Sequence, residues 1–327
     1  MRHFSGHEPV APHAAAQIDN LMEKPLQAIR DHASDHHGLL VRYPQMNDHS
    51  AILIELALAE DLGAGDVTSS YFIPAERQAR AFVTARKEGV VSGVELAARV
   101  FATVDRDLHV DILIADGSRV SDGALLMCVE GKARSILTGE RTALNFLQHL
   151  SGVATLTARY VDLVGGTRAR ILDTRKTTPG YRLLEKQAVV HGGGGNHRLG
   201  LYDRVMVKDN HIIVEGGAAA IQAAIHRMRA EKPGIEVELE ADRMAQVRTY
   251  LALDGADHIL LDNMSLDEMR EAVAARGTRL TPLLEASGGV TLGTVRGIAE
   301  TGVDFISVGA LTHSAPALDI GLDFMLR

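Results

Sequence analysis

The chain has 327 residues, of which 46% are hydrophobic and 23% charged, a composition typical of globular proteins and not of disordered or fibrous ones. The length predicts about two domains. The net charge is −8, aromatic residues make up only 4% of the chain and Trp is absent. Because nucleic acids and membrane surfaces are polyanionic, we expect neither as a partner.

One cysteine is present, Cys128. A single thiol can form neither an intramolecular disulfide nor a cysteine-based zinc site, so nothing indicates an oxidising compartment. The sequence has no apolar run of about 18 residues, and residues 1–13 lack the apolar core of a secretory signal. We therefore expect a cytoplasmic protein.

Residues 1–48 are predicted to be an N-terminal extension with little fixed order. The first 49 residues hold seven of the 15 histidines, among them His32 and His36, which are four residues apart. That spacing would suit two metal ligands on one helix face, but no carboxylate or cysteine pattern accompanies it.

Residues 49–150 are predicted to form an α/β sandwich domain. The run from Ala51 to Leu62 has the apolar spacing of a helix, and segments 79–89, 107–117 and 123–133 read as short antiparallel strands between glycine-bearing turns. A long helix is predicted over 139–164, leading into the next domain. Segment 315–327 is expected to pack back on the sandwich.

Residues 151–314 are predicted to form a βα barrel. Short runs rich in Ile, Val and Leu alternate with helical periodicity, which indicates a parallel sheet covered by helices. Six such runs occur, fewer than the eight of a complete barrel, so we expect an incomplete barrel of about six βα units. The six runs are 170–174, 204–209, 235–240, 258–262, 281–287 and 304–309.

Polar residues cluster where these strands end, which is where βα barrels carry their active sites. Ser287, Gly288 and Gly289 precede a helix expected to begin near Thr291, and Ser307 and Gly309 follow the last strand. Such turns can direct backbone N–H groups at a phosphate, and barrel phosphate sites often follow the last two strands.

A second group of candidate site residues is positively charged. Segment 141–211 holds eleven Lys and Arg against five Asp and Glu, in a chain that is acidic as a whole. Guanidinium groups bind carboxylates bidentately and lysine adds a compact charge, so the set suits a substrate with two carboxylates. Its members are Arg141, Arg175, Lys176, His197, Arg198 and Lys208.

Carboxylates occur at the ends of two neighbouring strands. Glu238 and Asp262 are suited to bind ribose hydroxyls or a hard cation such as Mg²⁺. Glu236, Glu238 and Glu240 share one face of their strand, because side chains in a strand alternate with a period of two. The choice between Glu238 and Glu240 therefore stays open.

Several long motifs together resemble the quinolinate phosphoribosyltransferase family, a group of type II phosphoribosyltransferases. The longest is DTRKTTPGYRLLEKQAVVHGGGGNHRLGLYDRVMVKDNH at 173–211. The likeness extends over LAEDLGAGDVTS, GERTALNFLQHLSGVAT, LLDNM, LEASGGV and DFISVGALTHSAPALDIGLDF, and thus over about residues 50–327.

The resemblance implies an N-terminal α/β sandwich and an incomplete βα barrel in a homodimer, with active sites where one subunit's sandwich meets the other's barrel. It implies transfer of phosphoribose from phosphoribosyl pyrophosphate (PRPP) to quinolinate with Mg²⁺, giving nicotinate mononucleotide, pyrophosphate and CO₂ in NAD biosynthesis. Whether protein side chains bind Mg²⁺ directly or only through PRPP stays open.

The resemblance also implies roles for individual residues. Lys176, Lys208, Glu238 and Asp262 are expected to be catalytic, with Glu238 and Asp262 as the Mg²⁺ acceptors. Quinolinate would be held by Arg141, Thr174, Arg175, Lys176, His197, Arg198 and Lys208. PRPP would be held by Lys176, Lys208, Glu238, Asp262, Ser287, Gly288, Gly289, Ser307 and Gly309.

Three alternatives are distinguishable. A related transferase would use nicotinate or another anionic ligand in place of quinolinate. A Schiff-base aldolase would use Lys208 or Lys176 as its nucleophile. A non-enzymatic anion-binding module would bind PRPP without releasing pyrophosphate.

Overall fold

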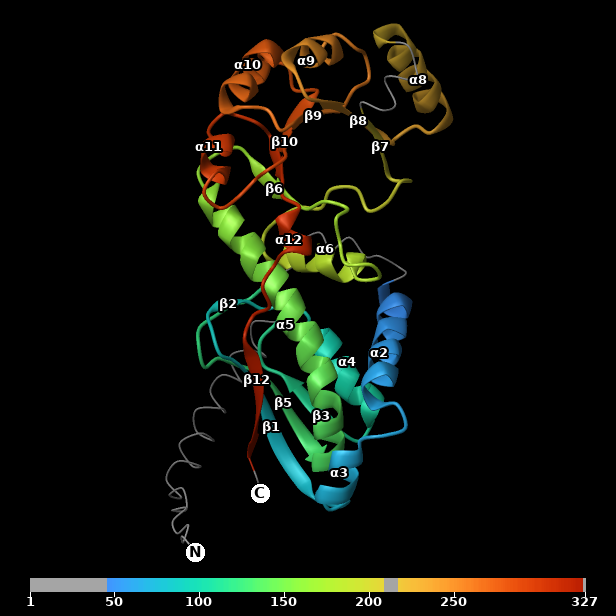
Figure 1. The fold of residues 1–327 in the computed structure, drawn as a ribbon, viewed down its shortest axis with the longest axis vertical. Helices are drawn as coiled ribbons and strands as arrows, with labels where there is room; N and C mark the ends of the chain where they lie inside the picture. Colours follow the sequence, from blue (N-terminus) through green and yellow to red (C-terminus); the bar gives the residue numbers. More distant parts are fainter. Residues whose placement is uncertain (1–45, 209–216, 326–327) are drawn as a thin grey trace, which may run out of the picture. The chain divides into compact units, whose positions relative to one another are not determined.

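In the computed structural model of the protein, residues 46–208 and 217–325 are described. The predicted extension, with His32 and His36, lies outside these residues. Two sheets organise the described chain, one antiparallel and one parallel (Figure 1). The chain is thus of the α/β class that the sequence predicts.

The antiparallel sheet has the strand order β12-β1-β5-β3. Its strands are β1 (Gln78–Ala85), β3 (His109–Ile112), β5 (Leu125–Lys132) and β12 (Ile320–Met325). In β1, Ala81 lies opposite Val129 on one side and Phe324 on the other. The last described strand therefore completes the sheet that the first strand begins, and Figure 1 shows the two side by side.

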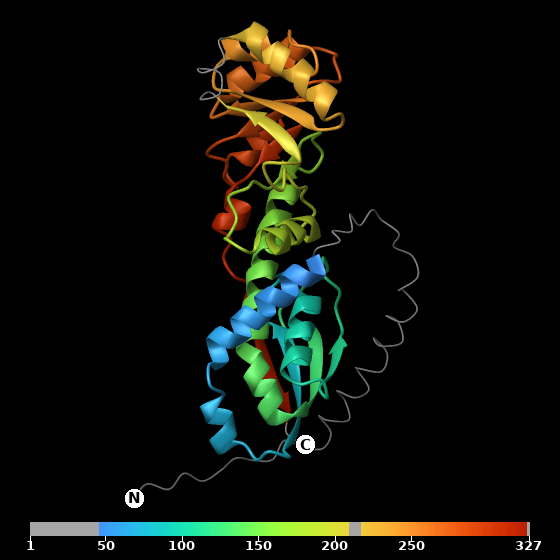
Figure 2. The same ribbon diagram turned by 90° about the vertical axis from the view of Figure 1, so that its right-hand side faces the viewer.

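Helices cover this sheet. α4 (Val94–Val104) and α5 (Ala133–Leu163) pack on each other and on its strands, as two views show (Figures 1 and 2). The remaining elements of this half are α2 (Met46–Leu62), α3 (Val67–Phe72), β2 (Gly89–Val90) and β4 (Arg119–Val120). α5 is the predicted long helix; it continues across position 150, where the domain boundary was expected.

The six predicted barrel strands all occur and pair in parallel, in the order β6-β11-β10-β9-β8-β7. They are β6 (Arg170–Leu172), β7 (Arg204–Val207), β8 (Glu236–Ala241), β9 (His258–Asp262), β10 (Leu283–Ser287) and β11 (Phe305–Ser307). Within the described residues β6 and β7 do not pair, so the barrel stays open between them.

Apolar side chains explain why these strands are buried on both faces. Leu239 of β8 lies between Val207 of β7 and Ile259 of β9, and both Leu239 and Ile259 are fully buried. On the outer side lie α8 (Ala218–Glu231), α9 (Met244–Tyr250), α10 (Leu266–Arg276) and α11 (Val295–Ala299) (Figure 1). α6 (Arg182–His191) and α12 (Ala310–His313) complete the helices.

The expected helix start near Thr291 is wrong. Regular α-helix begins only at Val295, because Thr291 and Thr294 first form a turn in which the Thr291 amide donates to Thr294 Oγ1 at 2.9 Å. Across the described portion of the chain, no helix combines the length and the hydrophobicity needed to cross a membrane.

Candidate active site

A cavity of about 490 Å³ opens at the carboxyl ends of the parallel strands. Eleven of the fourteen residues predicted for the site line it: Thr174, Arg175, Lys176, His197, Arg198, Lys208, Asp262, Ser287, Gly288, Gly289 and Ser307. Met206, Glu240, Leu260, Asn263 and Glu285 line it as well. The strand ends therefore bring residues from 174 to 307 to one place.

Three predicted residues do not line this cavity. Arg141 lies on α5 with its side chain exposed to solvent. Gly309 lies just past β11, where an added Cβ would be 3.3 Å from Lys176 Cδ. Glu238 is completely buried below the cavity floor.

Strand periodicity leaves the choice between Glu238 and Glu240 open, and the structure places the two side chains differently. Glu240 lies two residues nearer the carboxyl end of β8, and its side chain is 15% exposed and faces the cavity. Of the two, only Glu240 lines the cavity, whereas Glu238, the predicted acceptor for ribose or Mg²⁺, is fully buried. Glu238 and Glu240 share one face of β8 and differ in how far along the strand each lies.

One wall of the cavity is cationic. The guanidinium of Arg198 donates to the carbonyl oxygen of Arg204 at 3.2 Å and contacts Met206 Sδ at 3.5 Å. Burial and the charge of Arg175 lower the pKa of Arg198. Two guanidinium groups close enough to repel each other in a partly buried wall indicate a site for an anion.

A buried ion pair supports this wall from behind. Lys186 Nζ lies 2.5 Å from Asp173 Oδ1 and donates to the carbonyl oxygen of His197 at 2.8 Å. The backbone N–H of His197 donates to the same Asp173 oxygen at 2.8 Å. Burial raises the pKa of Asp173 to about 6, although Lys186 opposes the shift. The segment that carries His197 and Arg198 is thus held by two fully buried side chains.

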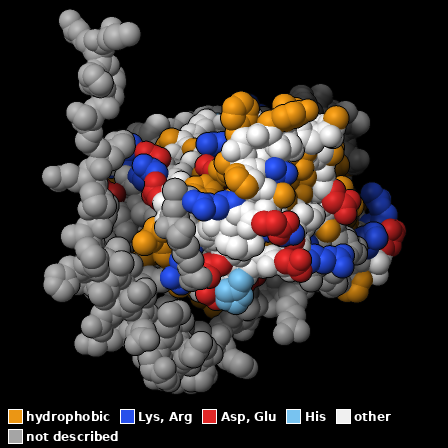
Figure 3. Space-filling model, turned by 90° about the horizontal axis from the view of Figure 1, so that it is seen from below, with side chains coloured by type: hydrophobic (Ala, Val, Ile, Leu, Met, Phe, Trp, Pro, Cys, Tyr) orange, Lys and Arg blue, Asp and Glu red, His pale blue; other side chains and the backbone are white. Residues whose placement is uncertain are grey.

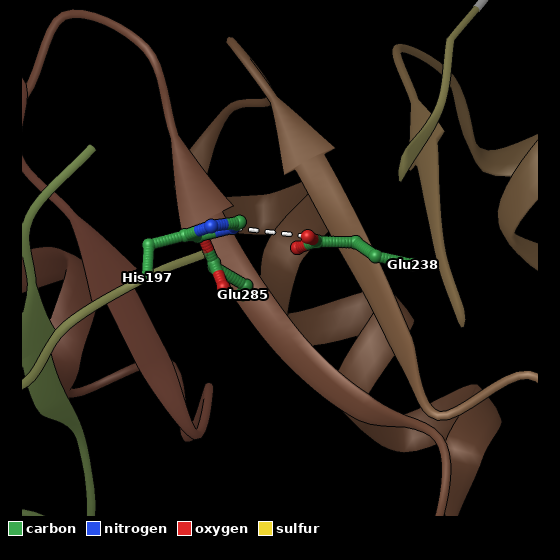
Figure 4. A group of neighbouring side chains, drawn as sticks. All are labelled: His197, Glu238 and Glu285. Carbon is green, nitrogen blue, oxygen red and sulfur yellow. Dashed lines mark ion pairs between the residues drawn. The ribbon is translucent and has the colours of Figure 1, made fainter. Parts of the chain in front are cut away.

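Beneath the cavity, His197 meets two buried carboxylates, Glu238 of β8 and Glu285 of β10 (Figure 4). His197 Nε2 lies 2.9 Å from Glu238 Oε2 and 3.4 Å from Glu285 Oε1. The Arg198 amide donates to His197 Nδ1 at 2.7 Å, which leaves the ring proton on Nε2, facing the carboxylates. Burial and the charge of Glu238 raise the pKa of Glu285 well above its usual range.

The opposite side of the cavity carries acidic groups and glycines. Glu240 Oε2 accepts from Lys208 Nζ at 2.6 Å, and Asp262 Oδ2 accepts from Asn263 Nδ2 at 3.0 Å. Gly288 has a φ of +94°, and a Cβ there would lie 2.1 Å from Asn263 Oδ1. Only glycine therefore fits this turn beside the cavity.

Sequence reasoning missed several cavity residues. Asn263 directly follows Asp262 and Glu285 lies two residues before Ser287, so proximity along the chain could have found them. Met206 and Leu260 are apolar residues at strand ends, where no polar signal distinguishes them from core residues. They supply apolar surface to the lining of the cavity.

An open βα barrel whose strand ends gather guanidinium groups, carboxylates and glycine turns around one cavity defines an enzyme that acts on anionic substrates. Comparison with family models identifies a family within this class of enzyme. Residues 66–151 match the N-terminal domain of quinolinate phosphoribosyl transferase, and residues 153–323 match its C-terminal domain. The chain belongs to the quinolinate phosphoribosyltransferase family, as its motifs predict.

Individual relatives agree. The nicotinate-nucleotide pyrophosphorylase [carboxylating] of Mycobacterium leprae is 44% identical over 277 residues, which cover 83% of this chain and 95% of that protein. Quinolinate phosphoribosyltransferase [decarboxylating] 1b of Nicotiana tabacum is 43% identical over 286 residues, covering 83% of this chain and 81% of that protein.

Solved structures confirm the predicted fold class. The nicotinate-nucleotide pyrophosphorylase of Francisella tularensis superposes with a TM-score of 0.79 at 37% identity, covering 85% of this chain and 97% of that chain. The nicotinate-nucleotide pyrophosphorylase of Pyrococcus furiosus is only 17% identical and has a TM-score of 0.64, so it shows the shared fold alone.

Proposed function

We propose that this chain transfers the phosphoribosyl group of PRPP to quinolinate and releases CO₂, giving nicotinate mononucleotide and pyrophosphate for NAD biosynthesis. The observation that carries the proposal is the division of one cavity. Its lining combines a cationic group that includes Arg175 and Arg198 with carboxylates and glycine turns that include Asp262 and Gly288. A dicarboxylate and a phosphorylated sugar could therefore bind side by side, as the reaction requires.

The cationic wall orients quinolinate. Arg175, Lys176, Arg198 and Lys208 supply charges for its two carboxylates, and a charge-assisted hydrogen bond of this kind is worth about 1.5–3 kcal/mol. Met206 and Leu260 supply apolar surface beside them. In this position the ring nitrogen is free to attack C1 of the ribose.

The opposite side binds PRPP. The turn at Ser287, Gly288 and Gly289, together with Ser307 and Gly309, would hold the 5′-phosphate through backbone N–H groups. The bond from C1 to pyrophosphate breaks as the pyridine nitrogen forms its bond to C1. Positive charge that develops on the ribose is stabilised by the carboxylates of Glu240 and Asp262.

Decarboxylation then needs no nucleophile from the protein. The bond from C2 of the ring to its carboxylate carbon breaks, CO₂ leaves, and the electron pair stays on C2 beside the positively charged nitrogen until a proton adds there. The substrate is its own electron sink, so the chain's contribution is positioning and charge. Cys128, buried in the antiparallel sheet, takes no part.

Mg²⁺ fits the residues present. Glu240 and Asp262 offer hard carboxylate oxygens at neighbouring strand ends facing the same cavity, which is the donor set that Mg²⁺ prefers. When bound, the ion would supply positive charge to the departing pyrophosphate. Glu238, buried beneath, is not part of this proposed set.

A homodimer completes the site in this proposal. Arg141 is exposed on α5 and does not reach the cavity of its own chain, so it would act in the cavity of a second copy. Exposed apolar side chains on α2 and α3 support an association; they are Ile52, Leu56, Val67, Tyr71 and Phe72. Seen from below in the space-filling view, hydrophobic side chains gather along one side of the molecule (Figure 3). The cytoplasmic location stays a prediction.

The test is a product assay. Purified protein with Mg²⁺, PRPP and quinolinate carrying ¹⁴C in its 2-carboxylate should release pyrophosphate and ¹⁴CO₂ in equal amounts. Nicotinate in place of quinolinate should give little product, because it leaves half of the cationic wall unpaired. Borohydride with a carbonyl compound should label no lysine. Release of pyrophosphate with nicotinate at the same rate, or a labelled Lys176 or Lys208, would overturn the proposal.

A further inference from the structure

We propose that Glu285 is a positioning residue that couples the quinolinate end of the cavity to the phosphate end, so that each substrate binds more tightly when the other is present. This inference rests on the proposed function. It concerns how two neighbouring subsites communicate through one buried side chain at the cavity.

The first step is the position of one atom. Glu285 Oε1 lies 3.4 Å from His197 Nε2 and also accepts a hydrogen bond from the hydroxyl of Ser307. His197 belongs to the wall proposed for quinolinate, and Ser307 to the end proposed for phosphate. A single oxygen is therefore shared by side chains of both subsites.

The second step is rigidity. Glu285 is completely buried, and His197 and Ser307 are each at most 5% exposed. Packed interiors move between discrete arrangements and do not deform continuously. A shift of His197 when quinolinate binds must therefore move the Glu285 carboxyl, and with it the acceptor that orients Ser307.

The third step is the support of His197 from its other side. Glu238 Oε2 faces the same ring nitrogen at 2.9 Å, and the guanidinium of Arg204 lies 3.8 Å from that oxygen. Glu238 and Glu285 come from strands separated by β9, and side chains from alternate strands share one layer in a βα barrel. Figure 4 shows the three side chains pointing toward one another. His197 is thus confined between Glu238 and Glu285, with the shorter distance to Glu238.

Coupling is measured with a pair of ligands that cannot react. Benzene-1,2-dicarboxylate has the two adjacent carboxylates of quinolinate but no ring nitrogen to attack PRPP. Its Kd is determined by calorimetry on the full chain, first alone and then with saturating PRPP and Mg²⁺. We expect PRPP to lower this Kd at least about fivefold in the unsubstituted protein, within the usual range of coupling between sites.

Two variants break the shared contact from opposite ends. Glu285→Leu removes the acceptor, and Ser307→Ala removes the donor without disturbing the buried carboxyl. In both variants, the Kd of benzene-1,2-dicarboxylate alone divided by its Kd with PRPP and Mg²⁺ should fall to within about twofold of one. Glu285→Gln retains a carbonyl oxygen for Ser307 and should keep the original ratio within about twofold. Loss of packing alone would weaken each ligand but would leave the ratio unchanged.

The inference is overturned if the unsubstituted protein shows a ratio of one, or if a folded Glu285→Leu or Ser307→Ala variant keeps the original ratio. If Glu285→Leu does not fold, Ser307→Ala decides the question. Circular dichroism and thermal unfolding report the fold of each variant. Failure of the proposed function is a separate result, because it would appear as absent turnover of quinolinate and PRPP by the unsubstituted protein.

Discussion

Lys208 Nζ lies 2.6 Å from Glu240 Oε2, so a cation proposed for quinolinate and a carboxylate proposed for the ribose end form an ion pair at the edge of the cavity. The Lys208 side chain is 49% exposed and that of Glu240 15% exposed, so solvent partly screens the pair. Substrates can therefore separate the two at little cost. Each charge is then available to its own ligand.

Glu240→Gln should reduce turnover about tenfold or more and raise the Mg²⁺ concentration needed for half-maximal rate, because it removes a hard anionic donor beside the ribose. The KM for quinolinate should stay nearly unchanged or fall slightly, since Lys208 loses its competing partner. Glu236→Gln, at the other end of β8, is the matched control. An identical Mg²⁺ titration for Glu240→Gln and the unsubstituted protein would contradict the assignment.

Arg198→Ala should weaken quinolinate far more than PRPP. The lost charge-assisted contact is worth about 1.5–3 kcal/mol, or about 10- to 150-fold in Kd. Calorimetry with each ligand separately gives the comparison, and Arg248→Ala on the outer surface should leave both affinities unchanged. Equal losses for quinolinate and PRPP would mean that Arg198 does not distinguish the two ends of the cavity.

Mixing two inactive variants tests the placement of Arg141. An Arg141→Ala subunit keeps an intact barrel, and a Lys208→Ala subunit keeps its Arg141, so a mixed dimer contains one site with both residues. Differently tagged, co-expressed subunits purified as the mixed species should recover about half of the normal activity per dimer, by the symmetry of a homodimer. A mixed dimer as inactive as its parents would show that Arg141 does not act in the partner's cavity.

The buried carboxyl of Glu285 should make stability depend on pH. Burial and the charge of Glu238 raise its pKa in the folded state above the 4.5 of an ordinary glutamate, so the folded protein holds a proton that the unfolded chain releases. The stabilisation is fully present below pH 4.5 and is lost as the pH rises through the folded-state pKa, at up to about 1.4 kcal/mol per pH unit.

Glu285→Gln cannot ionise, so its free energy of unfolding relative to the unsubstituted protein should increase as the pH rises from 4.5. Urea denaturation of both proteins between pH 4.5 and 8 measures this difference. A parallel set of Glu300→Gln measurements, at an exposed position, should show no such trend. A constant difference at Glu285 would mean that its pKa is not raised.

Strand identity was readable from the sequence because it depends on local pattern. All six runs of the second half became parallel strands, since runs rich in Ile, Val and Leu are typical of buried parallel strands; in β8 these apolar residues alternate with glutamate. The α4 helix was not predicted between the antiparallel strands. Its residues lie between the segments 79–89 and 107–117 that were assigned to strands, although Leu96, Val100 and Phe101 recur at helical spacing and are buried.

The sequence indicated which residues lie near the strand ends, but not how deep in the barrel each of them lies. Polar residues after apolar runs marked the strand ends correctly, but Glu238 and Glu240 have the same residue type and the same face. What separates them is how far each lies along β8 from the mouth of the cavity, a distance set by six strands together. The position of Arg141 relative to a second subunit lies beyond any single chain's pattern.

The pairing of β12 with β1 has a consequence for how the chain is made. On the ribosome, β1 emerges long before β12, with the whole barrel synthesised between them. Until then β1 presents an unpaired edge, which is prone to wrong pairing with other chains. The barrel can fold while its sequence is still being translated, but the antiparallel sheet must wait for residues 320–325. Synthesis of residues 320–325, and not of the first strands of the sheet, therefore determines when the antiparallel sheet is completed.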